Sequence, residues 1–416
     1  MAVAGDTEVN AGARIMQRCD ALAELSEDSY GLTRTFGTSM HRHALELIGK
    51  WMSEAGMNVR QDAAGNLIGR YEAAEEGAPC IMMGSHQDSV RDAGKYDGPL
   101  GIVAPIEAVS ALARTAARLP VAIEVIAFTD EEGTRFQTAL LGSRAVVGTL
   151  DRATLCARDR SGITLAEAMR EFGLDPDRID EARRRPHEII AFVETHIEQG
   201  PRLQDADQPL GVVTGIAGAS RLRVGLSGQA GHAGTVPMDR RRDAMCAAAE
   251  MVLACEDLAV GEQEMVATVG QVTVGPGAIN VIPGEAAFAV DLRAPVDADR
   301  ERGERELIRR FEDVASRRGV GIDVDILYRA GACASDSEIM NRLAVAVGSV
   351  GGKPLRLVSG AGHDAMAMAG LVPMGMLFVR CKDGISHNPA EEIRLDDADM
   401  AARALVEFLR SYTTTA

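Results

Sequence analysis

The sequence lacks the closely spaced cysteine pairs that are typical of disulfide-rich proteins. Its seven cysteines are an odd number, and none belongs to a Cys-x-x-Cys motif. Small secreted proteins often need a disulfide framework, but a chain of 416 residues is long enough to bury a large core without one. A reducing compartment fits this composition best, so we predict a cytoplasmic protein.

Long apolar segments are also absent. The longest stretch without a charged residue, 265–284, is interrupted by Pro276 and Pro283 with glycines beside them, which predicts a strand followed by a turn and not a membrane span. The N-terminal residues include Asp6 and Glu8 and lack the apolar core of a signal peptide. We therefore expect no membrane partner and no targeting segment.

Positive charge is scarce. The 44 lysines and arginines are outnumbered by 61 aspartates and glutamates, which gives a formal net charge of -17. A charge of this sign repels phosphate backbones and anionic lipids. The arginine cluster at 240–242 is short and is followed by Asp243, so we interpret it as a solvated helix start. Nucleic acid is not an expected partner.

Short apolar runs that end at reactive side chains are present instead. The hydrophobic content of 46% is that of a soluble globular protein, and the length favours two domains. Four runs lead directly into polar residues, at 80–88, 121–132, 189–196 and 374–387. Ligands of open α/β sheets bind beyond the carboxyl ends of the strands, so these four junctions should converge.

The order of the expected elements predicts two domains. A helix expected at 100–119, which begins after Pro99, lies between the first two runs and gives the strand, helix and strand of an α/β layer. Residues 213–330 differ, because they predict the β-α-β-β-α-β order of a ferredoxin-like α+β domain. Its elements are expected at 221–226, 243–258, 265–274, 285–292, 299–318 and 321–328. We predict an α/β domain of residues 1–213 and 331–416, with a mixed, mostly parallel sheet flanked by helices, and an inserted domain of residues 214–330.

Imidazoles and carboxylates gather at the strand ends. A hydrolytic metal centre needs such side chains, held rigidly, with an open position for water. His86 is a candidate ligand, Asp88 would fix its tautomer, and Asp97 has two oxygens that could bridge two ions. Glu131 and Glu132 point in opposite directions if extended, so one should be a ligand and the other free to act on water. Each residue alone has an ordinary structural explanation, but the whole set favours a metal site.

Five motifs follow one another between about Arg34 and Glu392. They are Gly84–Val90 (GSHQDSV), Asp97-Gly98, Asp130–Gly133 (DEEG), Glu194–Pro201 (ETHIEQGP) and Ser386–Pro389 (SHNP). Together they resemble the motifs of the hydantoinase/carbamoylase family. This family is a branch of the di-metal aminoacylase and peptidase superfamily and includes N-carbamoyl-L-amino acid hydrolases, β-ureidopropionases and allantoate amidohydrolases.

The resemblance implies two divalent metal ions per subunit and a general base, Glu131. One ion would be held by His86, Asp97 and His196, and the other by Asp97, Glu132 and His387. His196 favours the carbamoylase branch, because many other members of the superfamily carry a carboxylate there. Zinc is the first choice of metal, with manganese, cobalt or nickel as alternatives, because imidazole and carboxylate ligands suit all four.

The resemblance also covers the inserted domain, which it implies is a lid and dimerisation domain. His232, in Gly231–Gly234, matches a lid histidine that stabilises the transition state. The implied substrate-binding residues are Gln199, Asn280, Arg293, Gly360, Ala361 and His363. Without the family we would interpret Arg293 as a surface residue of an edge strand, although a guanidinium suits a substrate carboxylate. Val236 and Pro99 depart from the family pattern, and neither departure removes a predicted ligand.

These observations predict a metal-dependent amidohydrolase that cleaves the linear C–N bond of a ureido acid with a metal-activated water. Segment 92–98 looks closer to allantoate amidohydrolases than to typical carbamoylases, which places allantoate slightly ahead of N-carbamoyl-L-amino acids. One alternative is an aminopeptidase or N-acyl amino acid deacylase on the same scaffold. Another is a non-catalytic protein that binds a small acid. The expected partners are a small ureido or carbamoyl substrate and a second copy of the chain.

Overall fold

A computed structural model describes residues 10–412 and divides them into two compact units. The first unit contains residues 10–214, 335–357 and 362–412, and the second contains residues 215–334 and 358–361. None of the helices within the described residues is long and apolar enough to cross a membrane.

The first unit is built around one mixed sheet. Its strands are β1 (Asn58–Gln61), β2 (Leu67–Tyr71), β3 (Cys80–His86), β4 (Ala122–Phe128), β5 (Ile189–Ile197), β6 (Leu210–Ile216), β14 (Leu355–Ser359) and β15 (Met374–Val379). They are ordered β1-β2-β4-β3-β5-β15-β6, with β14 also paired to β6. The central strands β4, β3, β5 and β15 run parallel, whereas β2 and β6 flank them in the antiparallel direction. The predicted mixed, mostly parallel sheet is confirmed.

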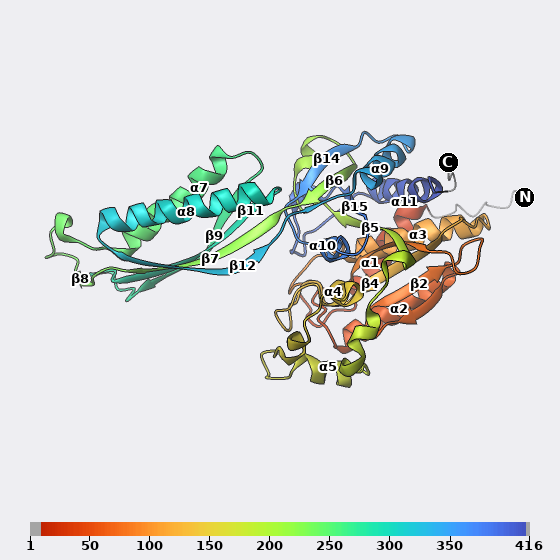
Figure 1. Cartoon of the computed structure of the whole chain (residues 1–416), viewed down its shortest axis with the longest axis horizontal. Helices are drawn as coiled ribbons and strands as arrows, with labels where there is room; N and C mark the ends of the chain where they lie inside the picture. Colours follow the sequence, from red (N-terminus) through yellow and green to blue (C-terminus); the bar gives the residue numbers. More distant parts are fainter. Residues whose placement is uncertain (1–9, 413–416) are drawn as a thin grey trace, which may run out of the picture. The chain divides into compact units, whose positions relative to one another are not determined.

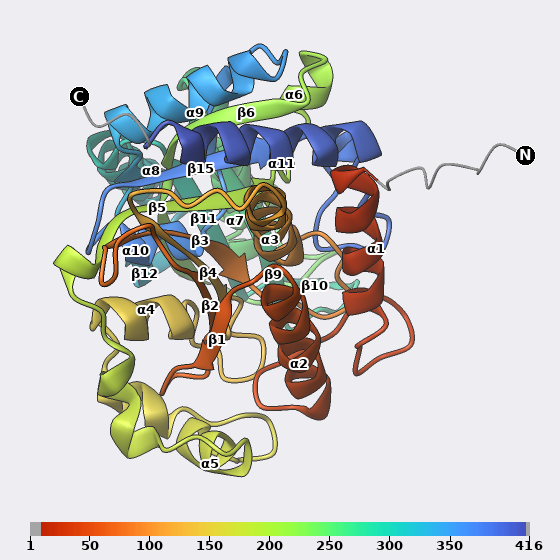
Figure 2. The same ribbon diagram turned by 90° about the vertical axis from the view of Figure 1, so that its right-hand side faces the viewer.

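Helices cover both faces of this sheet. They are α1 (Ala11–Ala23), α2 (Ser39–Glu54), α3 (Pro99–Arg114), α4 (Leu141–Val147), α5 (Leu165–Glu171), α6 (Arg202–Asp205), α9 (Ser337–Ser349), α10 (Asp364–Met368) and α11 (Leu395–Arg410). Figure 2 shows α2 and α3 on one side of β3 and β4, with α4 and α10 on the other. Because both faces are covered, every residue of β3, β4 and β15 is buried, which explains why these strands are mostly apolar.

Helix α3 is shorter than the sequence predicts. It starts at Pro99, as expected, because a first-turn residue needs no intrahelical N–H bond. It ends at Arg114 and not near Leu119, because Ala116 adopts the left-handed conformation with φ 51°. The apolar residues predicted at helical spacing all lie within this shorter helix and are buried, so only its C-terminal bound differs from the prediction.

The second unit has the predicted β-α-β-β-α-β order. Its elements are β7 (Gly218–Ser227), α7 (Ala244–Gly261), β9 (Val266–Gly275), β11 (Glu285–Ala294), α8 (Asp297–Arg318) and β12 (Gly321–Ala330). The sheet order is β12-β7-β11-β9 with antiparallel neighbours, and α7 and α8 lie side by side on one of its faces (Figure 1). Short strands β8 (Gly231–His232) and β10 (Val281–Ile282) form a separate ribbon, and β13 (Cys333–Ala334) pairs with the end of β6. The sequence predicted none of these three.

A buried cluster of ion pairs on β4 allows a mutational test of how the sheet is stabilised. Glu124 is 2% exposed and is bound by Arg184 at 2.6 Å and by Arg70 at 3.1 Å. Replacing Glu124 with Ala removes the buried carboxylate that joins two partly buried guanidinium groups, although Arg184 keeps Glu188 and Arg70 keeps Glu72, so we expect a loss of about 3 kcal/mol in the free energy of unfolding, measured by urea denaturation. The matched change Glu72→Ala removes an exposed partner of Arg70 and should cost less than about 1 kcal/mol. Equal losses in the two variants would contradict this account.

Candidate metal centre

The sheet delivers the predicted ligands to one edge. His86 is the last residue of β3, His196 lies near the end of β5, and Glu131 and Glu132 lie three and four residues after the end of β4. In the parallel pairing, His86 lies opposite Phe128, and His196 lies opposite Phe378 of β15. The carboxyl ends of these strands therefore meet at the same place, as the sequence predicted. His387 lies in the segment that follows β15.

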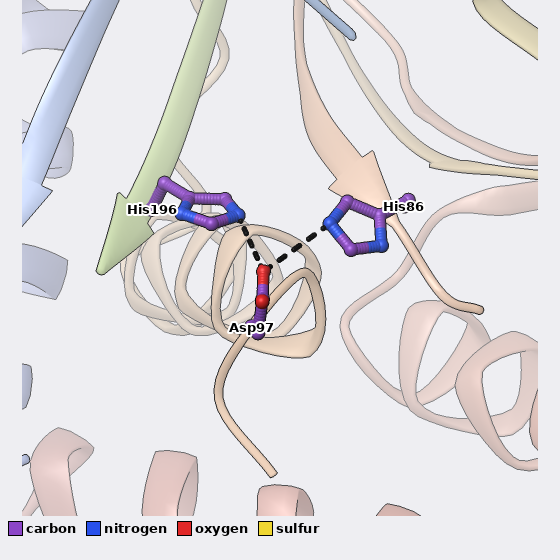
Figure 3. A group of neighbouring side chains, drawn as sticks. All are labelled: His86, Asp97 and His196. Atoms are coloured by element: carbon purple, nitrogen blue, oxygen red, sulfur yellow. Dashed lines mark ion pairs between the residues drawn. The ribbon is translucent and has the colours of Figure 1, made fainter. Parts of the chain in front are cut away.

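The carboxylate of Asp97 lies at the centre of this group. Its Oδ1 atom is 3.5 Å from Nε2 of His86 and 3.0 Å from Nε2 of His196, so it lies between the two rings (Figure 3). Its Oδ2 atom is 3.0 Å from Nε2 of His387, whose ring is also 3.3 Å from Oε1 of Glu132. Asp97 thus belongs to two clusters at once, one with His86 and His196 and one with Glu132 and His387.

These two clusters fit a pair of divalent cations. Four bonds of about 2.1 Å in a tetrahedral arrangement place neighbouring ligand atoms roughly 3.4 Å apart, which is close to the separations seen here. All the potential ligand atoms within each cluster lie within 4.8 Å of one another. The donors are imidazole nitrogens and carboxylate oxygens without a thiolate, a set that suits zinc and manganese alike.

The histidine rings are oriented by main-chain carbonyls. Nδ1 of His86 is 3.0 Å from the carbonyl oxygen of Asp88, and Nδ1 of His196 is 3.0 Å from that of Ile197. An Nδ1–H that donates to a carbonyl leaves the lone pair on Nε2, where a metal ligand needs it. We expected the Asp88 carboxylate to make this contact with His86, but it lies 3.7 Å away.

The Asp88 carboxylate instead holds the segment of the predicted base. Its two oxygens accept hydrogen bonds from the backbone N–H groups of Glu131 at 3.0 Å and Glu132 at 3.1 Å. The residue before them, Asp130, has φ 51°, so the chain turns out of the sheet at this point. This turn allows both adjacent glutamates to lie beside His86.

Glu131 has the electrostatic properties of a proton acceptor. Burial raises the pKa of its carboxyl group well above the ordinary value, a nearby His86 opposes that shift, and the Glu132 carboxylate adds to it. A carboxylate whose pKa lies closer to neutrality both accepts and returns a proton more readily.

The pKa of Asp97 is shifted in the opposite direction. Burial would raise its pKa, but the three facing histidine rings, which donate from Nε2 in their protonated form, outweigh burial and hold the pKa well below the ordinary value.

A second layer of polar side chains holds Asp97, and the sequence analysis missed part of it. Gln199, predicted to bind substrate, donates from Nε2 to Oδ2 of Asp97 and to Oγ of Ser386, each at 3.1 Å. Ser386 also lies 3.1 Å from Oδ2 of Asp97. Glu391 accepts from the backbone N–H groups of Tyr96 at 2.7 Å and Asp97 at 3.1 Å. No sequence signal distinguished the buried Glu391 from its exposed neighbour Glu392.

His363 lies behind the ligands. Its side chain is 1% exposed, and its ring packs edge-on against His196 with 4.5 Å between centroids and against Phe378 with 5.9 Å. Burial lowers the pKa of His363 well below the ordinary value, with the nearby His196 adding to that effect. In this structure His363 therefore supports a ligand ring from behind.

The remaining predicted residues belong to the second unit. His232 in β8 pairs with Val281 in β10, and the N–H of Ala233 donates to the carbonyl oxygen of Asn280 at 3.0 Å. Arg293 binds Asp291 through two hydrogen bonds and donates to the carbonyl oxygen of Gly360 at 2.7 Å. His232 and Asn280 are thus neighbours on one ribbon, and Arg293 contacts the segment that contains Gly360 and Ala361.

Comparisons with known proteins identify the family of the chain. Residues 82–411 match the family described as peptidase family M20/M25/M40. An N-carbamoyl-L-amino acid amidohydrolase of Geobacillus stearothermophilus is 42% identical over 95% of this chain and 97% of its own length. Allantoate deiminase 1 of Glycine max is 39% identical over 94% and 87%. A crystal structure of a hydantoinase/carbamoylase family amidase from Burkholderia multivorans, 31% identical, superposes with a TM-score of 0.91 over 97% of this chain and 98% of that one. The resemblance predicted from the motifs is confirmed.

Gly98 offers a test of how the ligand cluster is packed. It has φ 85°, and a Cβ added there would lie 2.6 Å from the Nδ1 and Cε1 atoms of the His86 ring. We expect Gly98→Ala to displace that ring and to weaken metal binding by roughly 10–100-fold, measured by competition with a chromophoric chelator. In the control Gly270→Ala, the added methyl group meets no atom within 4 Å, so metal affinity should not change. Unchanged affinity in both variants would contradict the role of Gly98.

Proposed function

The chain belongs to the peptidase family M20/M25/M40, and we propose that it is a metal-dependent amidohydrolase that cleaves the linear C–N bond of a ureido acid. The substrate would be allantoate or an N-carbamoyl-L-amino acid, the classes named in two of its relatives. The observation that supports this most is the shared Asp97 carboxylate, which faces three histidine rings at 3.0–3.5 Å.

Two divalent cations fit the proposal, with zinc as the first choice and manganese, cobalt or nickel as alternatives. His86, Asp97 and His196 would hold one, and Asp97, Glu132 and His387 the other. When bound, such ions polarise the substrate carbonyl and lower the pKa of a water molecule. Asp97 suits a shared ligand because its carboxyl group stays ionised in spite of burial.

Glu131 is assigned the proton transfers. It would take a proton from the attacking water and return it to the leaving nitrogen, which its raised pKa favours. Asp88 would keep this segment in place through the backbone N–H groups of Glu131 and Glu132. His232 is assigned the stabilisation of the negative oxygen in the transition state.

Substrate recognition is assigned to Asn280 and Arg293. Arg293 is fixed in plane by two hydrogen bonds to Asp291, which use only one edge of its guanidinium group. NH1 also donates to the Gly360 carbonyl, which leaves one N–H on each terminal nitrogen for a substrate carboxylate. Gly360 and Ala361 would line the same site, because the Gly360 carbonyl contacts Arg293. Gln199 and His363 keep the substrate-binding role that the resemblance implies, and their contacts also support Asp97 and His196.

A homodimer is part of the proposal. The second unit exposes several large apolar side chains on α7, β9 and β12, among them Leu253, Val272 and Leu327, which are 44–59% exposed. They lie on α7 and on the two outer strands of the sheet, and exposed apolar side chains of this size are what an interface with another protein surface would cover. A second copy of this chain is the partner that the family resemblance implies. Cytoplasmic location stays a prediction from composition.

Replacing Glu131 with Gln separates proton transfer from metal binding. The amide keeps the shape of the side chain but accepts no proton, so we expect turnover to fall by about 10²–10⁴-fold while metal content stays at the native level. The matched variant Glu132→Gln should instead lower the metal content, measured by inductively coupled plasma mass spectrometry. Glu131→Gln with near-native turnover would remove the assigned base.

A substrate panel tests the reaction class. We expect ammonia release from allantoate or from N-carbamoyl-L-amino acids, with little from N-carbamoyl-D-amino acids, and loss of activity after chelation that added metal restores. β-Ureidopropionate completes the panel. Hydrolysis of dipeptides or N-acetyl amino acids, with none of ureido compounds, would favour an aminopeptidase or deacylase on this scaffold. A metal-free protein that binds a small acid without turnover would indicate a non-catalytic protein.

A further inference from the structure

The ring of His232 is held by its own loop. The backbone N–H of Gly234 donates to Nδ1 of His232 at 3.1 Å. A nitrogen that accepts a hydrogen bond carries a lone pair, so the proton of the neutral ring is on Nε2. An Nε2–H group is the donor that a developing oxyanion needs, whereas the other tautomer would present a lone pair there.

Arg241 holds this loop from the other side. Its NH2 group donates to the carbonyl oxygen of Ala233 at 2.6 Å, and its Nε donates to that of Val236 at 3.1 Å. Between these carbonyls the loop closes on itself, because the N–H groups of Thr235 and Val236 both reach the carbonyl oxygen of His232. The guanidinium group therefore spans the turn that contains Gly234, and it is half-buried there.

We propose that Arg241 is a positioning residue that keeps the Gly234 N–H aimed at Nδ1 of His232 and so fixes the tautomer of that ring. The inference rests on the proposed role of His232. Two separate carbonyls need two donors in a rigid plane, which a guanidinium group provides and a lysine ammonium does not. The contact at position 236 is with the main chain, so the departure from the family pattern at Val236 leaves it intact.

The neighbouring arginines do not share this role. Arg240 is exposed, and Arg242 donates to the side chain of Gln229 at 2.6 Å. Arg240 thus offers a matched control, because its replacement removes the same charge one residue away. Only Arg241 bridges the carbonyls on either side of Gly234.

The kinetic test is a double-mutant cycle on the metal-loaded enzyme, with Arg241→Ala, His232→Ala, the double variant and Arg240→Ala. Removing an oxyanion donor costs about 10²–10³-fold in kcat, so His232→Ala should fall in that range and Arg241→Ala should lose about tenfold or more, with KM within about twofold. Arg241→Ala should cause no further loss of kcat in the His232→Ala background, because Arg241 acts through that ring.

Rescue experiments test the same role. Arg241→Lys should not restore kcat, whereas added guanidinium ion should restore part of it in Arg241→Ala. Arg240→Ala should behave as the native enzyme.

A second measurement needs no turnover. In protein labelled with ¹⁵N-histidine, at a pH where an ordinary imidazole is neutral, native His232 should show a protonated Nε2 and an accepting Nδ1, with its signals assigned by their loss in His232→Ala. Arg241→Ala should mix the two tautomers, and Arg240→Ala should not. An unchanged tautomer in Arg241→Ala, or an equal loss of kcat in both backgrounds, would overturn the proposal. If His232→Ala retains native kcat, the assigned role of His232 fails, and the tautomer result still decides whether Arg241 orients the ring.

Discussion

The buried charge of Asp97 is the constraint on which the rest of the site depends. A carboxylate that is 2% exposed is stable only if opposite charges or hydrogen-bond donors surround it. Here three histidine rings, Gln199 and Ser386 approach its two oxygens, and Glu391 fixes the backbone on which it lies. These groups come from β3, from β5 and the residues after it, and from the segment after β15. The parallel centre of the sheet brings them together around this one side chain.

Two carboxyl groups of the site have pKa values shifted in opposite directions because their surroundings differ. Asp97 faces histidine rings and stays ionised, whereas burial and the neighbouring carboxylates favour the neutral form of Glu131. Such a difference suits the proposed roles of Asp97 as a metal ligand and of Glu131 as a proton carrier. The division depends on the turn at Asp130, which brings both Glu131 and Glu132 to the same edge of the sheet.

Much of this arrangement could be predicted from the sequence, because apolar runs mark the strands and reactive residues mark their ends. His86, Glu131 and His196 were found in this way, and the order of elements in the second unit followed from periodicity. Contacts between segments that are distant in the sequence could not be predicted. Glu391 and Asp97 are 294 residues apart, and no local pattern links them. The ribbon of β8 and β10 was missed because strands of two residues are too short to show alternation.

The tripeptide Asp97-Gly98-Pro99 leaves little freedom for change. Its first residue must carry a charge, its second has no room for a methyl group, and its third begins α3 without an N–H group to satisfy. Random mutagenesis aimed at a new substrate would therefore lose most variants altered at these codons. A library aimed at substrate preference would therefore keep codons 97–99 constant.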